Sequence, residues 1–147
     1  MATLVVPMAG RSSRYPNLRP KWMLSHPMSN TFMGIAAIQG LNLDFFDKIY
    51  WVTLKEYQEK YQFEQGYLEE LDQVGLKEKS EIVLLEEETS SQSETVCELI
   101  KKKNIKDFIF IKDSDGYYEC ELKDGSNQVA YFDLNDMDNI NARSKSY

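Results

Sequence analysis

The chain has 147 residues, which is enough for one domain with a single hydrophobic core. Hydrophobic residues make up 42% and charged residues 28%, the composition of an ordinary globular protein. The net charge of −7 argues against nucleic acid and against an anionic membrane surface as partners. No run reaches the roughly 18 apolar residues of a membrane span, and no leader pattern opens the chain. We therefore expect a single cytoplasmic domain over residues 1–147, in which Cys97 and Cys120 stay reduced.

The first third of the chain predicts two strands separated by a long loop and a helix. A β-branched run at residues 4–6 predicts the first strand, which Pro7 ends. Residues 8–30 contain three prolines, a glycine and several serines, a composition typical of a loop. Apolar residues at helical spacing predict a helix over 31–41, and an apolar run predicts the second strand over 48–53.

The middle of the chain continues this alternation. An apolar stripe predicts one helix over 57–71, which Gly75 closes, and a β-branched run predicts the third strand over 81–85. Ser91 and Glu94 match a capping box, so we expect the next helix to begin there. Three lysines at 101–103 predict its end, because cations stabilise the negative end of the helix dipole.

The last third predicts a central strand and two further strands. The run at 107–112 is continuously apolar, as expected of a central strand that is covered on both faces. Two shorter pieces at 117–122 and 128–134 are joined by a turn at 123–126. The alternation of strands and helices predicts an α/β fold, a Rossmann-like three-layer sandwich with a mostly parallel sheet. Ligands of such folds bind at the carboxyl ends of the strands.

The loop after the first strand has the residues of an anion site. Small residues around Gly10 can turn their backbone N–H groups toward an anion, and Arg14 and Lys21 add fixed positive charge. Two named phosphate-binding motifs are excluded, because the Walker A loop needs a second glycine before the lysine and the dinucleotide fingerprint needs three glycines. The alternative is a surface loop with solvated cations, which we favour for Arg11 or Arg19 taken alone.

The segment from Val5 to Tyr15, followed by Pro20 and Lys21, resembles the signature of nucleotidyltransferases of the sugar-nucleotide pyrophosphorylase type. It is most similar to the form found in enzymes of capsule and surface-polysaccharide biosynthesis. The resemblance implies that this loop wraps the triphosphate of a nucleotide and that Arg14 and Lys21 are catalytic. The family usually has glycine where this chain has serine at position 12. The residues that it implies for nucleotide binding are Met8, Ala9, Gly10, Arg11, Ser12 and Ser13.

A second segment resembles the family loop that meets the base or the sugar. It leads into the helix predicted from Ser91, and the resemblance implies nucleotide contacts for Gln92, Glu94 and Thr95. A helix start suits a ligand because its first N–H groups are free and its dipole is positive. The alternative is that Ser91 and Glu94 only cap the helix, and both descriptions can hold together.

Two carboxylates follow the predicted strand at 107–112. Asp113 and Asp115 stand at alternate positions, project the same way and can hold a hard cation. Asp115 matches the metal-binding aspartate of the family better, and Asp113 is the second candidate; Mg²⁺ is the implied cofactor. The alternative is a simple turn, for which the sequence from Asp113 to Gly116 is also well suited.

Taken together, the resemblance implies a nucleotidyltransferase. It would transfer a nucleoside monophosphate from CTP, UTP or dTTP to a phosphorylated acceptor, such as a sugar phosphate, and release pyrophosphate. The alternatives are a non-catalytic nucleotide-binding half-domain and a cytidylyltransferase for a non-sugar acceptor such as choline phosphate. Residues 141–147 resemble a stretch that runs onward in the family, so we expect the nucleotide-diphospho-sugar transferase fold to be truncated here, with the acceptor-binding half and a second metal-binding aspartate beyond residue 147. An oligomer is compatible with this function.

Overall fold

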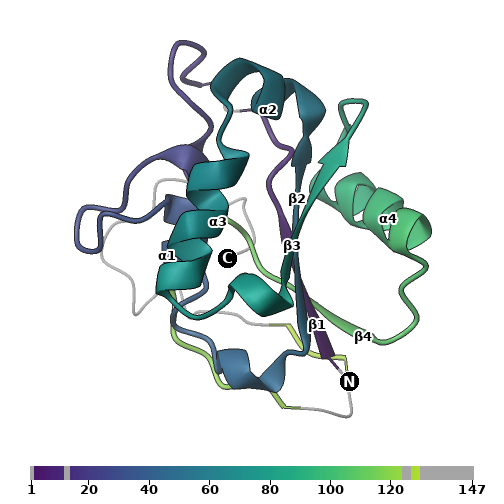
Figure 1. The fold of residues 1–147 in the computed structure, drawn as a ribbon. Helices are drawn as coiled ribbons and strands as arrows, with labels where there is room; N and C mark the ends of the chain where they lie inside the picture. Colours follow the sequence, from purple (N-terminus) through teal and green to yellow (C-terminus); the bar gives the residue numbers. More distant parts are fainter. Residues whose placement is uncertain (1, 12–13, 124–126, 130–147) are drawn as a thin grey trace, which may run out of the picture.

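The computed structural model describes residues 2–11, 14–123 and 127–129. Four strands form one sheet: β1 (Ala2–Pro7), β2 (Lys48–Leu54), β3 (Ser80–Leu85) and β4 (Phe108–Ile111). All pairs are parallel and the order across the sheet is β3-β2-β1-β4. The chain therefore has the predicted α/β architecture, with β1 inside the sheet (Figure 1).

Helices cover both faces of this sheet, which gives three layers. Figure 1 shows α1 (Met33–Ala37) and α3 (Glu64–Gln73) on one face and α4 (Gln92–Lys103) on the other. The short helix α2 (Lys55–Tyr61) follows β2 directly. Three 3-10 turns complete the fold: η1 (Lys21–Met23), η2 (Leu43–Phe45) and η3 (Lys77–Lys79). The arrangement is Rossmann-like, as the alternation of strands and helices predicts.

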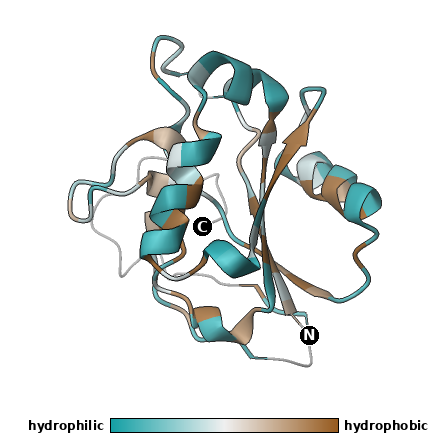
Figure 2. Cartoon of the chain, in the orientation of Figure 1, coloured by the Kyte–Doolittle hydropathy of each residue, from teal (hydrophilic) through white to brown (hydrophobic). Residues whose placement is uncertain are grey.

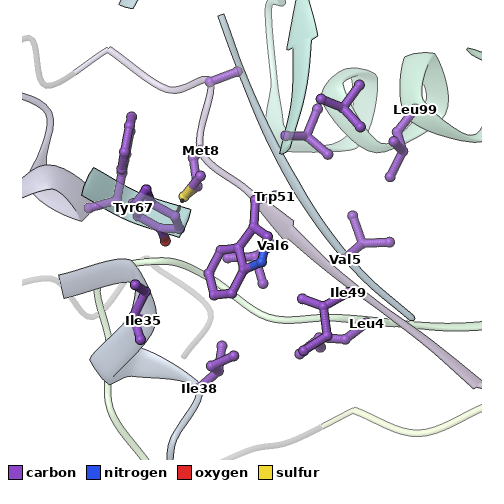
Figure 3. Close-up of a cluster of buried hydrophobic side chains, with 14 of the residues drawn as sticks. Leu4, Val5, Val6, Met8, Ile35, Ile38, Ile49, Trp51, Tyr67 and Leu99 are labelled. Carbon is purple, nitrogen blue, oxygen red and sulfur yellow. Dashed lines mark hydrogen bonds between the residues drawn. The ribbon is translucent and has the colours of Figure 1, made fainter. Parts of the chain in front are cut away.

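The core lies on both sides of β1, whose six residues are all buried. The pairing of Leu4 with Ile49 and of Val6 with Trp51 brings large apolar side chains onto the face that α1 and α3 cover. Figure 3 shows this cluster, with Tyr67 beside Met8, and Val5 with Leu99 on the opposite side. Full burial of such a side chain contributes about 1.5–3 kcal/mol. Figure 2 shows the apolar character of the strands against the hydrophilic surface of α2.

The helix predicted over 57–71 is divided in two. Gln62 has a left-handed backbone with φ of 48°, which ends α2 before α3 begins. The break turns Phe63 into the core, where its ring centroid lies 4.8 Å from that of Trp22. A stripe of apolar residues does not reveal such a break, because Tyr57 and Tyr67 are buried on either side of it. Gly75, with φ of 75°, closes α3 as predicted.

The helix predicted over 31–41 is shorter than expected, because the chain turns after α1. A Cβ at Gly40 would lie only 2.2 Å from the carbonyl oxygen of Tyr118, so the backbones are in close contact there. The predicted strand at 117–122 is reduced to one isolated bridge between Leu41 and Cys120. Its backbone bonds therefore go to the 40–42 segment and not to the sheet; Asn42, for example, binds both backbone groups of Leu122. Most of the strand predicted at 128–134 lies outside the described residues, as do residues 141–147.

The position of β4 corrects a prediction. The apolar run at 107–112 was expected to be a central strand, but among the described strands β4 lies at the edge, and β1 is the one buried throughout. Phe108 and Ile111 are 57% and 51% exposed. The helix α4 packs mainly on β1 and β2. Within the described residues, none of the helices has the length and apolar character that a membrane span requires.

Candidate functional site

An open cavity of about 330 Å³ lies where β1 and β4 end. Two loops that the sequence places at the same edge of the sheet meet here: the loop after β1, which we call the β1 loop (residues 8–20), and the loop after β4, which we call the β4 loop (residues 112–116). The start of α4 adds a further polar side chain. The lining includes Gly10, Arg14, Tyr15, Lys21, Gln92 and Asp115. The structure thus brings residues of all three predicted segments into one site.

The β1 loop starts inside the core. Met8 and Ala9 are 1% and 2% exposed. The N–H of Met8 donates to the carbonyl of Val52, and its own carbonyl accepts a 2.9 Å hydrogen bond from the hydroxyl of the buried Thr53. Because β2 holds both backbone groups of Met8, the chain leaves β1 in a fixed direction. The residues that follow are therefore delivered to the cavity by the sheet itself.

Gly10 is exposed and has free space around it. A Cβ built on this residue would meet no atom within 4 Å, and its φ is not positive. The fold therefore does not require glycine at this position. The carbonyl of Gly10 accepts a 3.1 Å hydrogen bond from the hydroxyl of Tyr57, which positions the backbone. An unhindered backbone beside a cavity is what the close approach of a phosphate needs.

Arg11 connects the β1 loop to two other segments. Its guanidinium donates hydrogen bonds of 3.1 and 2.6 Å to both carboxylate oxygens of Glu56, and its Nε lies 2.8 Å from Glu88. The hydrogen bonds with Glu56 and Glu88 raise the pKa of Arg11, and the bond from Arg11 lowers the pKa of Glu56. In the free protein this charge is thus neutralised by α2 and by the loop after β3. Ser12 and Ser13 lie outside the described residues, so their nucleotide contacts stay predictions.

Lys21 and Asp115 meet across the cavity. The Nζ of Lys21 lies 3.3 Å from Oδ2 of Asp115, and both side chains are partly exposed. Pro20 directs the chain into η1, in which Trp22 is buried and fixes the backbone next to Lys21. Arg14 lines the same cavity, and none of the described carboxylates pairs with it. Arg14, Lys21 and Asp115 therefore converge here.

Asp113 differs from Asp115 in its partner. Its carboxylate binds the ammonium of Lys112, a lysine that is 1% exposed. Asp113 also lines the cavity, but its charge is already paired, whereas Asp115 reaches toward Lys21. No cluster of three or more His, Cys, Asp or Glu side chains suited to a metal occurs among the described residues.

The start of α4 lines the cavity through Gln92. Gln92 also borders a second cavity of about 240 Å³, which runs from Gly10 to Ser90 and Thr95. The predicted cap is present, because the Oγ of Ser91 accepts a 3.2 Å hydrogen bond from the N–H of Glu94.

The other two residues predicted in this segment have internal partners. The carboxylate of Glu94 accepts hydrogen bonds from the N–H and the hydroxyl of Ser90, which lower its pKa. The hydroxyl of Thr95 is buried and lies 2.6 Å from that of Thr89. Both residues therefore shape the loop before α4, and contact with a nucleotide stays a prediction for each.

The sequence did not predict the residues that pair with charged groups of the two loops, which are Lys112, Glu56 and Glu88. Lys112 carried a signal, since a lysine that ends a continuous apolar run and precedes an aspartate has both a buried position and a partner. Glu56 and Glu88 carried none, because their contact with Arg11 depends on how α2 and the loop after β3 meet in space.

The geometry alone shows two cations, Arg14 and Lys21, beside the carboxylate of Asp115 in one cavity. Comparison with models of known protein families found no match, and comparison with curated proteins found none either. The nucleotidyltransferase resemblance therefore rests on the motifs of the sequence.

Proposed function

We propose that this chain binds a nucleoside triphosphate at the carboxyl edge of its sheet, as the nucleotide-binding part of a nucleotidyltransferase. The observation that carries the proposal is the meeting of Lys21 and Asp115. The sequence predicts one as a phosphate ligand and the other as a metal ligand, and they lie 3.3 Å apart in one cavity although they are 94 positions apart in the sequence. Binding of a triphosphate with a divalent cation requires cations and a carboxylate side by side.

The donor set fits Mg²⁺ in the form that accompanies a nucleotide. Mg²⁺ is usually held by one or two carboxylates while phosphates and waters complete its shell. Asp115 offers one partly exposed carboxylate to the cavity, and Asp113 is next to it. When bound, Mg²⁺ would neutralise charge on the phosphates. Asp115 would exchange its pairing with Lys21 for the metal, which would free the ammonium of Lys21 for a phosphate oxygen.

In the proposed reaction an oxygen of the acceptor's phosphate attacks the α-phosphorus of the nucleotide. A new P–O bond forms, the bond from the α-phosphorus to the bridging oxygen breaks, and pyrophosphate leaves. No side chain forms a covalent bond, so catalysis depends on positioning and on charge. Arg14 and Lys21 stabilise the charge that develops on the phosphate oxygens, and the backbone around Gly10 contributes N–H donors.

The motif resemblance supports CTP, UTP or dTTP as the nucleotide. It also supports a sugar phosphate, or a small phosphorylated molecule such as choline phosphate, as the acceptor. We place the reaction in the synthesis of capsule or surface-polysaccharide precursors, in the cytoplasm. The second cavity is the place for the base, because Ser90, Gln92 and Thr95 line it with hydroxyl and amide groups beside Gly10.

The first test is binding. Calorimetric titration with CTP, UTP, dTTP and ATP, with and without Mg²⁺, should show saturable binding of at least one nucleotide, and Mg²⁺ should strengthen it. In the matched comparison Lys21→Ala should lose affinity, and Lys77→Ala, an exposed lysine outside the cavity, should not. Absence of binding by every nucleotide under both conditions would refute the proposal.

The second test is turnover. Pyrophosphate release should be measured on the full-length gene product with the nucleotide that binds and a panel of sugar phosphates and choline phosphate. Release that depends on one acceptor supports the transferase. Tight Mg²⁺-dependent nucleotide binding without release for any acceptor would instead favour a non-catalytic nucleotide-binding module.

A further inference from the structure

Lys112 is a buried lysine whose charge has partners. Its side chain is 2% exposed, whereas lysine is rarely buried fully in proteins. The Nζ donates to the carboxylate of Asp113, to the carbonyl of Asp113 at 3.1 Å and to the carbonyl of Gly116. All three ammonium protons therefore have an acceptor. The ring of Tyr118 lies against the same ammonium, with its centroid 4.5 Å from Nζ.

These contacts surround a turn that presents Asp115. The two carbonyls that point at Nζ belong to Asp113 and Gly116, so the ammonium closes the residues between them into one loop. Gly116 is packed closely, since a Cβ there would lie 3.0 Å from Oδ2 of Asp113. The first residue of the loop is fixed as well, because the N–H of Lys112 donates to the carbonyl of Val5 in β1.

We propose that Lys112 is a positioning residue: its ammonium folds residues 113–116 into the turn that holds Asp115 at the cavity. The inference rests on the proposed function in so far as Asp115 serves a nucleotide and its metal. It also assigns different roles to the two aspartates. Asp113 neutralises Lys112 and keeps the turn closed, and Asp115, at the tip of the turn, is the carboxylate available to a ligand.

A different role for Lys112 would be purely electrostatic. If the lysine only supplied positive charge near the cavity, its removal would weaken binding of the nucleotide and strengthen binding of Mg²⁺ to the remaining carboxylates. A positioning role gives the opposite result for the metal. With the turn open, Asp115 is no longer held beside Lys21, so Mg²⁺ should add little to nucleotide affinity. The two roles can therefore be separated by the dependence of binding on Mg²⁺.

The test uses Lys112→Met, which keeps the length of the side chain and removes the charge, with Lys106→Met on an exposed lysine as the matched control. Nucleotide affinity is measured with and without Mg²⁺. We expect Lys112→Met to retain most of the Mg²⁺-free affinity and to lose the gain that Mg²⁺ produces, and Lys106→Met to behave as wild type. The double variant with Lys112→Met and Asp113→Asn restores the net charge, and Mg²⁺ should still fail to raise its nucleotide affinity. A normal Mg²⁺ gain in Lys112→Met would overturn the proposal.

A ligand-free measurement keeps the proposal separate from the proposed function. Hydrogen exchange of the peptide that covers residues 110–120 should be roughly tenfold faster or more in Lys112→Met, because the bonded amides of Lys112 and Cys120 flank the turn that the ammonium closes. Exchange should be unchanged in Lys106→Met. Unchanged exchange in Lys112→Met overturns the positioning role, whether or not the protein binds nucleotides. If Lys112→Met does not fold, Asp113→Ala tests the same turn from its exposed side, and unchanged exchange would refute it equally.

Discussion

The two loops that meet at the cavity each contain a cation that is neutralised internally, but the two cations differ in burial. Arg11 of the β1 loop is bound by Glu56 and Glu88, and all three side chains are between 41% and 56% exposed. Lys112 of the β4 loop is bound by Asp113 and two carbonyls with almost no exposure. Water screens the first set of contacts more than the second, in which Asp113 is 47% exposed but the ammonium of Lys112 is buried. The β1 loop can therefore adjust to a ligand at little cost, and the β4 loop is held in place before a ligand arrives.

A second contrast lies among the cations of the β1 loop and of η1, which follows it. Arg11 has two carboxylate partners, whereas Arg14 has none among the described carboxylates and Lys21 has one, across the cavity. We therefore expect substitutions of Arg14 and Lys21 to change nucleotide binding or turnover, and substitution of Arg11 to change only the stability of the loop.

The largest effect is expected for Lys21→Ala. Loss of one preorganised positive donor at the reacting phosphates should lower the rate of pyrophosphate release by roughly a hundredfold to a thousandfold. The melting temperature should stay near wild type, because the side chain is partly exposed and Asp115, with which it pairs among the described residues, is exposed as well. Initial rates on the full-length product, with Lys77→Ala as control, measure this. A near-normal rate of pyrophosphate release would mean that Lys21 serves the ligand no more than Arg11 does.

Arg14→Gln should weaken nucleotide binding by about tenfold to a hundredfold, since hydrogen bonds to charged groups are worth that much. Its melting temperature without ligand should not change, because no described carboxylate depends on it. Calorimetric titration beside Arg11→Gln gives the comparison directly. Equal losses of affinity in the two variants would show that Arg11 also serves the ligand.

Gly10→Val should lower nucleotide affinity without lowering the melting temperature. The fold has room for a side chain at this position, so the melting temperature should stay within experimental error or rise slightly. A ligand that approaches the backbone closely would meet the added atoms, and nucleotide affinity should fall about tenfold. Gly66→Val is the matched control, because Gly66 also has free space but lies in α3, away from the cavity. Unchanged affinity in Gly10→Val would argue against a phosphate at this backbone.

Arg11→Gln should have the smallest effect. We expect a small fall in melting temperature that shrinks as salt is added, because the contacts are exposed. The fall should also depend on pH. Folding lowers the pKa of Glu56 from its ordinary value of 4.5, so its stabilising contribution is present above pH 4.5 and is lost as the pH falls through the folded-state pKa. Melting curves of wild type and variant should therefore converge as the pH falls below 4.5; a difference that does not shrink with falling pH would show that the contact is not ionic.

Local patterns were sufficient for much of the fold. The strands near residues 4–6, 48–53 and 81–85 and the capped start of α4 were predictable because each depends on neighbouring residues only. The break at Gln62 and the edge position of β4 were not, because both depend on which distant segments pack together. In the site too, features that depend on packing between distant segments could not be predicted.

In the site, the positions of Lys21 and Asp115 at one sheet edge follow from parallel topology, and the structure brings them together. The partner of Arg11 could not be predicted, since Glu56 lies on a different element and no spacing rule relates the two. The distinct surroundings of Asp113 and Asp115 required the structure, because their sequence positions differ by only two residues and both precede the same turn.

The pairing of β1 also determines when the site can form during synthesis. Among the described strands β1 is made first, but its partner on one side is β4, where Ala2 aligns with Phe108. Parallel pairing over such a separation is slow, because a long loop must close before the contact stabilises it. The cavity needs the β4 loop, so the Lys21–Asp115 contact is expected to form among the last steps of folding. A ribosome-bound chain that ends before residue 108 has the β1 loop but no cavity.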